Sequence, residues 1–175
     1  MLDVRIHGQE EIRRVAAALR RADRTDLRKA MAREIRTAGR VVVDDVRTVV
    51  RTLPIRGFPF PGRKRAFSAA RWSPSHQLRE QVAAGVSLQL ALSETDPRVR
   101  FRASGSKVPG ESGANMPRRL DDAAGWRHPV LGNRQVWVKQ QGKPWFAATI
   151  YRRRREFERR LGQALEDTRR AIETA

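Results

Sequence analysis

Three kinds of side chain in this sequence could carry chemistry: histidines, adjacent aspartates and clustered basic residues. A hydrolase needs a nucleophile, a base and an orienting group, and the base is nearly always a histidine. The three histidines, His7, His76 and His128, stand alone in segments that we interpret as strand, loop and turn. No grouping of His, Asp or Glu has the spacing of metal ligands. For His128, between Arg127 and Pro129, stabilising a turn is a better interpretation than catalysis.

The aspartates form two adjacent pairs, Asp44–Asp45 and Asp121–Asp122. Neighbouring residues of a helix point about 100° apart, so neither pair can converge on one metal ion or proton unaided. There is no glycine-rich phosphate-binding motif and no cysteine, which excludes disulfides, thiolate catalysis and Cys-ligated zinc or iron–sulfur sites. We therefore expect no catalytic residues, no metal site and no cofactor.

The charge is strongly unbalanced, because 37 Lys and Arg residues against 19 Asp and Glu residues give a net charge of +18. This excess favours a polyanionic partner, either nucleic acid or an acidic protein surface. It is equally compatible with an arginine-rich coding bias spread over solvated faces. The run Arg152–Arg155 lies in a predicted helix, and we favour a solvated face with the ion pairs Arg152–Glu156 and Arg154–Glu158.

Residues 54–74 predict a long loop or extended arm. The segment holds four prolines and no acidic residue, so it cannot form a helix or a central strand. We expect it to become ordered only in an assembly, against an adjacent subunit, a neighbouring ring or DNA. The residues expected to make these contacts are Phe58, Phe60, Arg63, Lys64, Arg65, Phe67 and Trp72.

The apolar spacing predicts an α+β fold, in which a small antiparallel sheet packs against two long amphipathic helices within a single domain, residues 1–175. Apolar residues recur every three or four positions from Leu27 to Leu53, and a second long helix is expected over residues 145–171, with Pro144 at its first position. Shorter helices are expected over residues 10–22, 76–84 and 117–124, and strands over residues 2–7, 86–92, 99–103 and 136–138, with 125–133 as a turn. The N-terminus does not resemble a signal peptide, and no stretch approaches the roughly 20 apolar residues of a membrane-spanning helix, so we expect a soluble protein without a membrane partner.

Three tryptophans lie close together in a chain that has few aromatic residues: Trp126, Trp137 and Trp145. Core packing and an oligomer interface explain them equally well. We predict that the three, with Phe146, form a cluster that seats the last helix on the sheet, so that Trp137→Ala would be strongly destabilising.

The segment that holds these tryptophans resembles the small neck proteins of long-tailed phages, the head-tail joining and tail-completion group of actinobacterial type. Members share an N-terminal helical part, a Leu-Arg piece before short strands (compare Leu78-Arg79), a His-Pro-x-x-Gly turn and a closing helix opened by Pro-Trp-Phe. The residues that carry the resemblance are Trp126, His128, Pro129, Gly132, Trp137, Pro144, Trp145 and Phe146.

The resemblance implies a non-enzymatic structural subunit of a homo-oligomeric ring. Such a ring would lie in the virion between portal or stopper and tail tube, joining the DNA-filled capsid to the tail, and its subunits would be made in the host cytoplasm. Its partners would be neighbouring connector and tail proteins, with non-specific contact to DNA in the channel. The arm at residues 54–74 departs from the shorter loop expected there, so neck, tail-completion and terminator positions stay open. The alternative is a small basic DNA-binding protein without sequence-specific readout.

Overall fold

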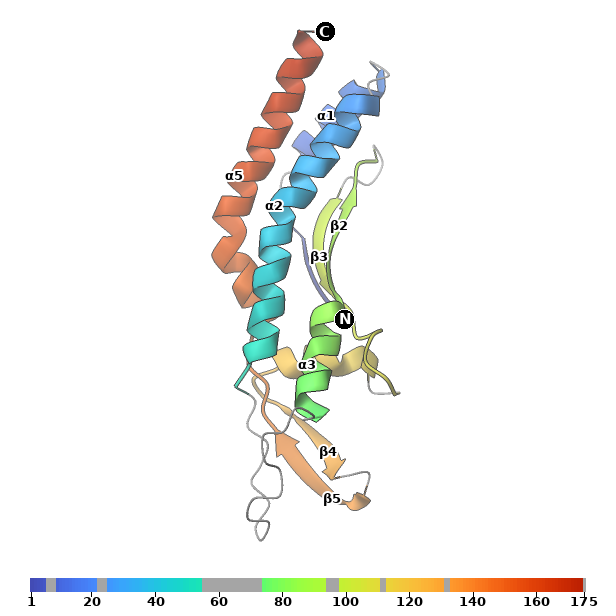
Figure 1. Cartoon of the computed structure of the whole chain (residues 1–175), viewed down its shortest axis with the longest axis vertical. Coiled ribbons are helices and arrows are strands. Elements are labelled where there is room, and N and C mark those ends of the chain that lie inside the picture. Colours follow the sequence, from blue (N-terminus) through green and yellow to red (C-terminus); the bar gives the residue numbers. More distant parts are fainter. Residues whose placement is uncertain are drawn as a thin grey trace.

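The computed structural model describes residues 1–5, 9–21, 25–54, 74–93, 98–110, 113–130 and 133–174. These residues form an elongated body of helices and a small sheet, with a separate β-hairpin at the end opposite the C-terminus (Figure 1). The elements in chain order are β1 (Leu2–Arg5), α1 (Gln9–Arg21), α2 (Thr25–Thr52), α3 (Pro74–Ala84), β2 (Val86–Ala91), β3 (Arg98–Ala103), a 3-10 turn (Gly113–Asn115), α4 (Met116–Asp121), β4 (Trp126–Val130), β5 (Asn133–Gln140) and α5 (Phe146–Glu173).

The first sheet has three antiparallel strands in the order β1-β3-β2. Its central strand, β3, alternates strictly: Val99, Phe101 and Ala103 are buried, and the arginines between them are partly exposed. Val4 of β1 and Leu88 of β2 both lie opposite Phe101. Since successive strand side chains point to opposite faces, one face of this sheet is apolar and the other is basic.

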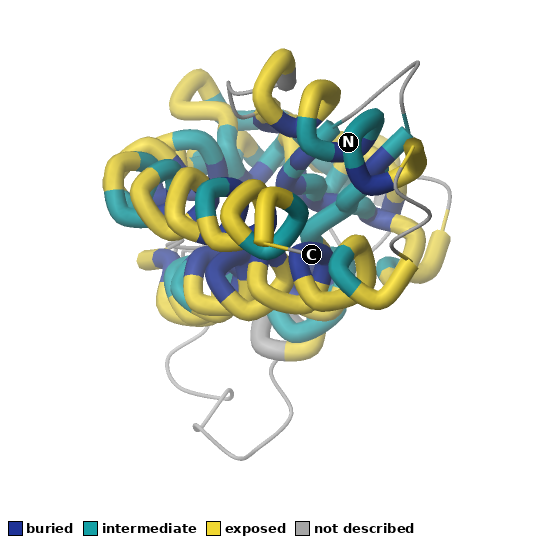
Figure 2. The backbone as a smooth tube through the Cα atoms, turned by 90° about the horizontal axis from the view of Figure 1, so that it is seen from above, coloured by how far each residue is buried: buried dark blue, intermediate teal, exposed yellow. Residues whose placement is uncertain are grey.

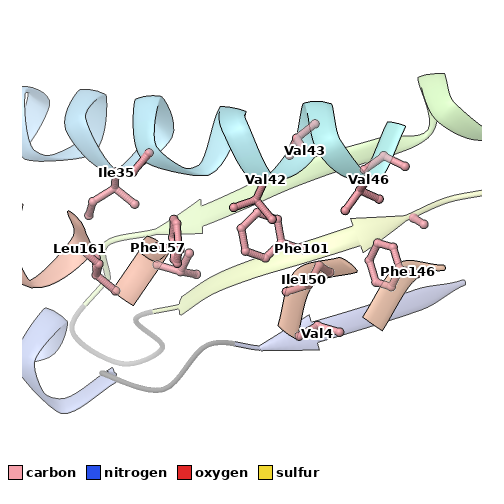
Figure 3. Close-up of a cluster of buried hydrophobic side chains, with 14 of the residues drawn as sticks. Val4, Ile35, Val42, Val43, Val46, Phe101, Phe146, Ile150, Phe157 and Leu161 are labelled. Atoms are coloured by element: carbon pink, nitrogen blue, oxygen red, sulfur yellow. The ribbon is translucent and has the colours of Figure 1, made fainter. Parts of the chain in front are cut away.

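Helices α2 and α5 run side by side in opposite directions and cover the apolar face of the sheet (Figure 1). Their outward surfaces are exposed and their inward surfaces are buried, as the view from above shows (Figure 2). Phe101 of β3 lies among Val42 of α2 and Phe157 of α5 (Figure 3), and the rings of Phe101 and Phe157 meet edge to face at 5.3 Å. At Gly39 the backbone of α2 lies so close to β2 that a Cβ atom would collide with the Leu88 side chain.

The structure confirms the α+β class, the antiparallel pairing of residues 86–91 with 98–103, and the two long helices. Three predictions about these elements were wrong. Residues 125–133, expected as a turn, contain strand β4, and the strand expected at 136–138 is part of β5, which pairs with β4 in a second sheet instead of joining the first. Pro144 does not begin α5, because Trp145 occupies the N-cap position and the helix starts at Phe146.

The predicted arm, residues 54–74, falls almost wholly outside the described residues, and so do all seven of its contact residues. Only its first and last positions are described: Pro54 follows α2, and Pro74 begins α3. Among the helices of the described ranges, none is both long and apolar enough to cross a membrane.

Candidate oligomerisation interface

The β4–β5 hairpin projects beyond the ends of α2 and α5 (Figure 1). Its strands pair antiparallel, with Trp126 opposite Gln140 and Pro129 opposite Trp137, and the register shifts next to Val130. An isolated two-stranded hairpin is only marginally stable in water. The hairpin therefore depends on what holds its base and on what contacts its faces.

Two glycines allow the base of the hairpin to form. Gly125 enters β4 with φ of +77°, and a Cβ there would overlap the carbonyl oxygen of Gln140. At the exit, Gly142 is surrounded by the backbone carbonyls of α4, and its N–H donates to Asp122 O at 3.2 Å. A side chain at Gly125 would separate β4 from β5, and one at Gly142 would push the exit of the hairpin away from α4.

Asp121 joins the hairpin exit to helix α5. Its Oδ1 accepts hydrogen bonds from the backbone N–H groups of Trp145 at 2.7 Å and Phe146 at 2.8 Å. The N–H of Lys143 donates to Leu120 O at 2.9 Å beside it. A carboxylate at a helix N-terminus satisfies N–H groups that have no partner in the helix and interacts favourably with the helix dipole. Asp121 thus caps a helix that begins far later in the chain, a role that its sequence neighbours do not signal.

The residues just after the hairpin confirm part of the predicted cluster. Trp145 is 0% exposed and Phe146 is 1% exposed, and their rings meet edge to face at 5.5 Å. Trp126, at the base of the hairpin, is partly buried and packs against the core. The indole N–H of Trp145 has no hydrogen-bond partner among the described residues. These aromatic residues seat the start of α5 in the body.

Trp137 does not belong to this cluster, so that prediction was wrong. Its side chain is 47% exposed, and its Nε1–H donates to Arg134 O on its own strand at 2.7 Å. Val136 is also 47% exposed. The physical reason is position: β5 lies beyond the helices, and no described element covers it. Because adjacent strand residues point to opposite faces, the hairpin exposes an apolar side chain on each face.

The remaining motif residues lie along the hairpin. His128 is in strand β4 and not in a turn; its Nδ1 lies 3.2 Å from Pro129 O, and its ring centroid lies 6.4 Å from that of Trp126. Pro129 lies opposite the exposed Trp137, and Pro144 is exposed just before the N-cap of α5. Gly132 falls outside the described residues.

Two of the four arginines in the run on α5, Arg153 and Arg154, pair with acidic residues. Arg154 pairs with Glu158 at 2.7 Å, as predicted. The predicted Arg152–Glu156 pair is wrong, because Glu156 accepts from Arg160 at 2.9 Å and lies 3.5 Å from Arg153.

Further ion pairs connect α5 to α2 and continue toward the end of α5. Arg153 also bonds to Asp45 of α2 at 2.5 Å, which ties the two long helices together. Farther along α5, the hydrogen bond from Arg169, with the charge of Arg170 beside it, lowers the pKa of Glu166. Helix α5 therefore holds Arg153, Arg154, Arg160, Arg169 and Arg170 in ion pairs, mainly with acidic residues of the same helix.

The two aspartate pairs do not converge, as their spacing predicted. Asp45 reaches α5, whereas Asp44 lies 3.5 Å from Arg47 on its own helix. Asp121 caps α5, and the Asp122 carboxylate accepts from the N–H of Ala124 at 2.9 Å. Within the described ranges no three His, Asp or Glu residues are grouped so that they could hold a metal ion.

Comparison with models of known protein families, with curated proteins and with solved structures finds no match to this chain. The functional argument therefore depends on the geometry of the hairpin and on the motif that it contains.

Proposed function

We propose that this chain is a structural subunit of a homo-oligomeric ring at the head-to-tail joint of a long-tailed phage, in a neck, tail-completion or terminator layer. The observation that supports assembly is the β4–β5 hairpin, which projects from the body and exposes Val136 and Trp137. The resemblance of residues 125–146 to the neck proteins supports the place of the ring in the virion.

The hairpin has the properties of a contact that is completed by another copy. Tryptophan is enriched among the residues that contribute most binding free energy to protein interfaces. Covering two exposed apolar side chains would also stabilise a hairpin that is only marginally stable alone. A ring requires that the hairpin of one subunit contacts a different surface of its neighbour. Such a head-to-tail contact generates a ring when its rotation closes.

We further propose that the subunit is not an enzyme. The acidic residues that could act as bases or ligands are engaged in structural roles: Asp45 joins two helices, Asp121 caps α5, and Glu156 and Glu158 pair with arginines. A connector needs rigid elements and complementary surfaces, and both long helices supply rigidity along the whole body.

The second candidate function is non-specific DNA binding, which the net charge of +18 favours. Several arginines on α5, among them Arg152, Arg155 and Arg159, are exposed. Binding to DNA phosphates releases counterions, and this release becomes less favourable as the salt concentration rises, so the affinity for DNA falls steeply with salt. The burial of apolar side chains is not weakened in this way. Salt therefore separates the two functions.

The test is the oligomeric state of the purified protein, measured by sedimentation velocity in about 1 M NaCl, where charges are screened within about 3 Å. The unaltered protein should remain a closed oligomer of one size, and the double variant Val136→Ser/Trp137→Ser should sediment as a folded monomer. The matched control is Val41→Ser/Tyr151→Ser, which removes two other exposed apolar side chains, 40% and 59% exposed, from the helical body. The control should remain oligomeric.

A monomer in high salt that forms large species only with added DNA would favour the DNA-binding function instead. Loss of the oligomer in the control but not in the hairpin variant would place the interface on the helices and contradict the proposal.

A further inference from the structure

A groove lies between the N-terminal half of α2 and the end of β2, far from the hairpin. At Gly39 the helix backbone lies against Leu88, but nearer its N-terminus α2 leaves a groove of about 360 Å³ beside the strand. Its lining residues are Thr25, Arg28, Lys29, Ala32, Arg36, Leu90 and Leu92. The lining combines an apolar floor of Ala32 and the two leucines with a rim of three cations and no carboxylate.

The cations on this rim differ from Arg153, Arg154 and Arg160 of α5, which pair with acidic side chains. Within the described ranges no acidic side chain pairs with Lys29 or Arg36, and both are exposed. Arg28 is fixed by a hydrogen bond from its Nη2 to Leu92 O at 3.2 Å, which holds it at one end of the groove. The rim is thus an uncompensated positive field above an apolar surface.

The strand beside the groove is an edge strand, since the sheet order is β1-β3-β2. Gly85 O accepts from Ser104 N–H at 3.0 Å, and Gly85 directly precedes the pairing of Val86 with Ala103. Along an antiparallel edge strand, the backbone N–H and C=O groups of one residue bond to the neighbouring strand, and those of the next residue point away from it. Since Gly85 bonds to β3, the backbone groups of Val86, Leu88 and Leu90 point away from β3. In agreement, Val86 O accepts from Arg47 Nη2 at 3.0 Å and not from the sheet. Between the arginine contacts at its two ends, β2 offers the backbone of Leu88 and Leu90.

We propose that this groove binds an extended segment of a partner protein in which an apolar residue lies between two acidic residues, each two positions away from it. The segment adds to the edge of β2 as a fourth strand. Alternate side chains of a strand share one face, so on the face toward α2 the apolar side chain contacts Ala32 and Leu90, and the two carboxylates pair with Lys29 and Arg36. Addition of a strand gives affinity through main-chain hydrogen bonds, and the side-chain contacts give specificity. This binding does not depend on ring formation.

The partner is a protein and not DNA, because phosphates would use the rim but leave the apolar floor and the strand edge without contacts. It is also not another copy of the described part of this chain. The acidic residues there lie mainly in helices, and Asp121, Glu156 and Glu158 already hold structural contacts.

The experiment measures fluorescence anisotropy of a fluorescein-labelled synthetic peptide, the Glu–Val peptide, titrated with the full chain; Glu, Val and Glu occupy every second position of the peptide, with Thr at the positions between them. Three further probes accompany it: the peptide with Lys in place of Glu, the Glu–Val peptide with every second backbone nitrogen methylated, and a short duplex DNA. The groove variant is Lys29→Glu/Arg36→Glu. The matched control, Arg152→Glu/Arg155→Glu, makes the same change of charge at exposed positions of α5.

The Glu–Val peptide should bind saturably, and the groove variant should weaken it at least about tenfold, while the control variant stays within about twofold. The Lys peptide and the methylated peptide should each bind at least about tenfold more weakly than the Glu–Val peptide, because one lacks the charge and the other the strand-edge hydrogen bonds.

The proposal is overturned if the Glu–Val peptide does not bind, if both variants weaken it equally, or if methylation leaves its affinity unchanged. A groove variant that loses affinity for duplex DNA, while the control keeps it and neither binds the peptide, would identify a phosphate-binding surface instead. Thermal melting of both variants checks that the exposed substitutions leave the fold intact.

Discussion

Trp145 and Trp137 belong to the same short motif, yet the body and the hairpin treat them in opposite ways. Trp145 is completely buried beside Phe146, whereas Trp137 is 47% exposed and, among the described residues, its indole N–H bonds to its own strand. In the body, helices and a sheet bury Phe101, Phe146 and Phe157. In the hairpin, two strands provide no third layer. The comparison teaches that a cluster in sequence can divide between holding a fold together and presenting a surface to a partner.

The boundary between the two regions is a small set of backbone contacts. Asp121 and the carbonyls of α4 hold the start of α5 on one side, and Gly125 and Gly142 turn the chain into and out of the hairpin on the other. Substitutions on the two sides of this boundary should therefore differ in how much they lower the free energy of unfolding and in how much of the structure they affect.

The largest effect should come from Trp145→Ala. Removing a completely buried indole leaves a cavity, so the free energy of unfolding should fall by about 3–5 kcal/mol. Trp145→Phe is the matched control: it keeps an apolar ring, leaves a smaller cavity and removes an indole N–H that has no partner among the described residues, so it should cost clearly less than Trp145→Ala. Urea denaturation followed by circular dichroism measures both. Equal losses would mean that the indole N–H contributes through a contact absent from this structure.

A smaller and local effect is expected for Gly125→Ala. A non-glycine residue at φ of +77° is strained by about 1–2 kcal/mol, and its Cβ would also overlap the carbonyl oxygen of Gln140. Hydrogen–deuterium exchange should show faster exchange at the amides of β4 and β5, with the amides of β3 unchanged. Faster exchange in both sheets would show that the hairpin and the body unfold as one unit. Gly162→Ala, in the open space along α5, serves as the control and should not speed exchange.

Asp121→Ala tests the link between the regions and should cost about 0.5–2 kcal/mol, as expected for loss of a helix cap. Asp122→Ala is the control, because the Asp122 carboxylate bonds only to the nearby N–H of Ala124 among the described residues. Thermal unfolding should rank Asp121→Ala as clearly less stable than Asp122→Ala. The opposite ranking would contradict the assignment of Asp121 as the cap of α5.

The smallest effect on folding should be that of Trp137→Ala. The side chain is half exposed on a projecting hairpin, so the free energy of unfolding of the monomer should change by no more than about 0.5 kcal/mol. The same substitution should weaken self-association, measured by sedimentation over a range of protein concentrations. A loss of several kcal/mol in the monomer would place Trp137 in the core and remove the distinction between body and hairpin.

Much of the body could be predicted from the sequence, because local patterns are sufficient for it. The apolar spacing from Leu27 to Leu53 matches the buried stripe of α2, and the alternation of Val99, Phe101 and Ala103 matches the buried face of β3. The hairpin was missed at Trp126–Val130, because glycine, proline and histidine within a short stretch are typical of a turn. The exposure of Trp137 was missed because a tryptophan alone does not indicate which layers surround it.

For the long helices and the first sheet, the sequence by itself determined which segments are helix or strand and which face of each is apolar, since these follow from the periods of the backbone and the burial of apolar side chains. Only the tertiary structure decided that Asp121 caps α5, that Arg153 bonds to Asp45, and that Lys29 and Arg36 line a groove beside β2. Each of these depends on how distant segments pack. Partners far apart in the chain have no fixed spacing, so their contacts leave no local pattern to read.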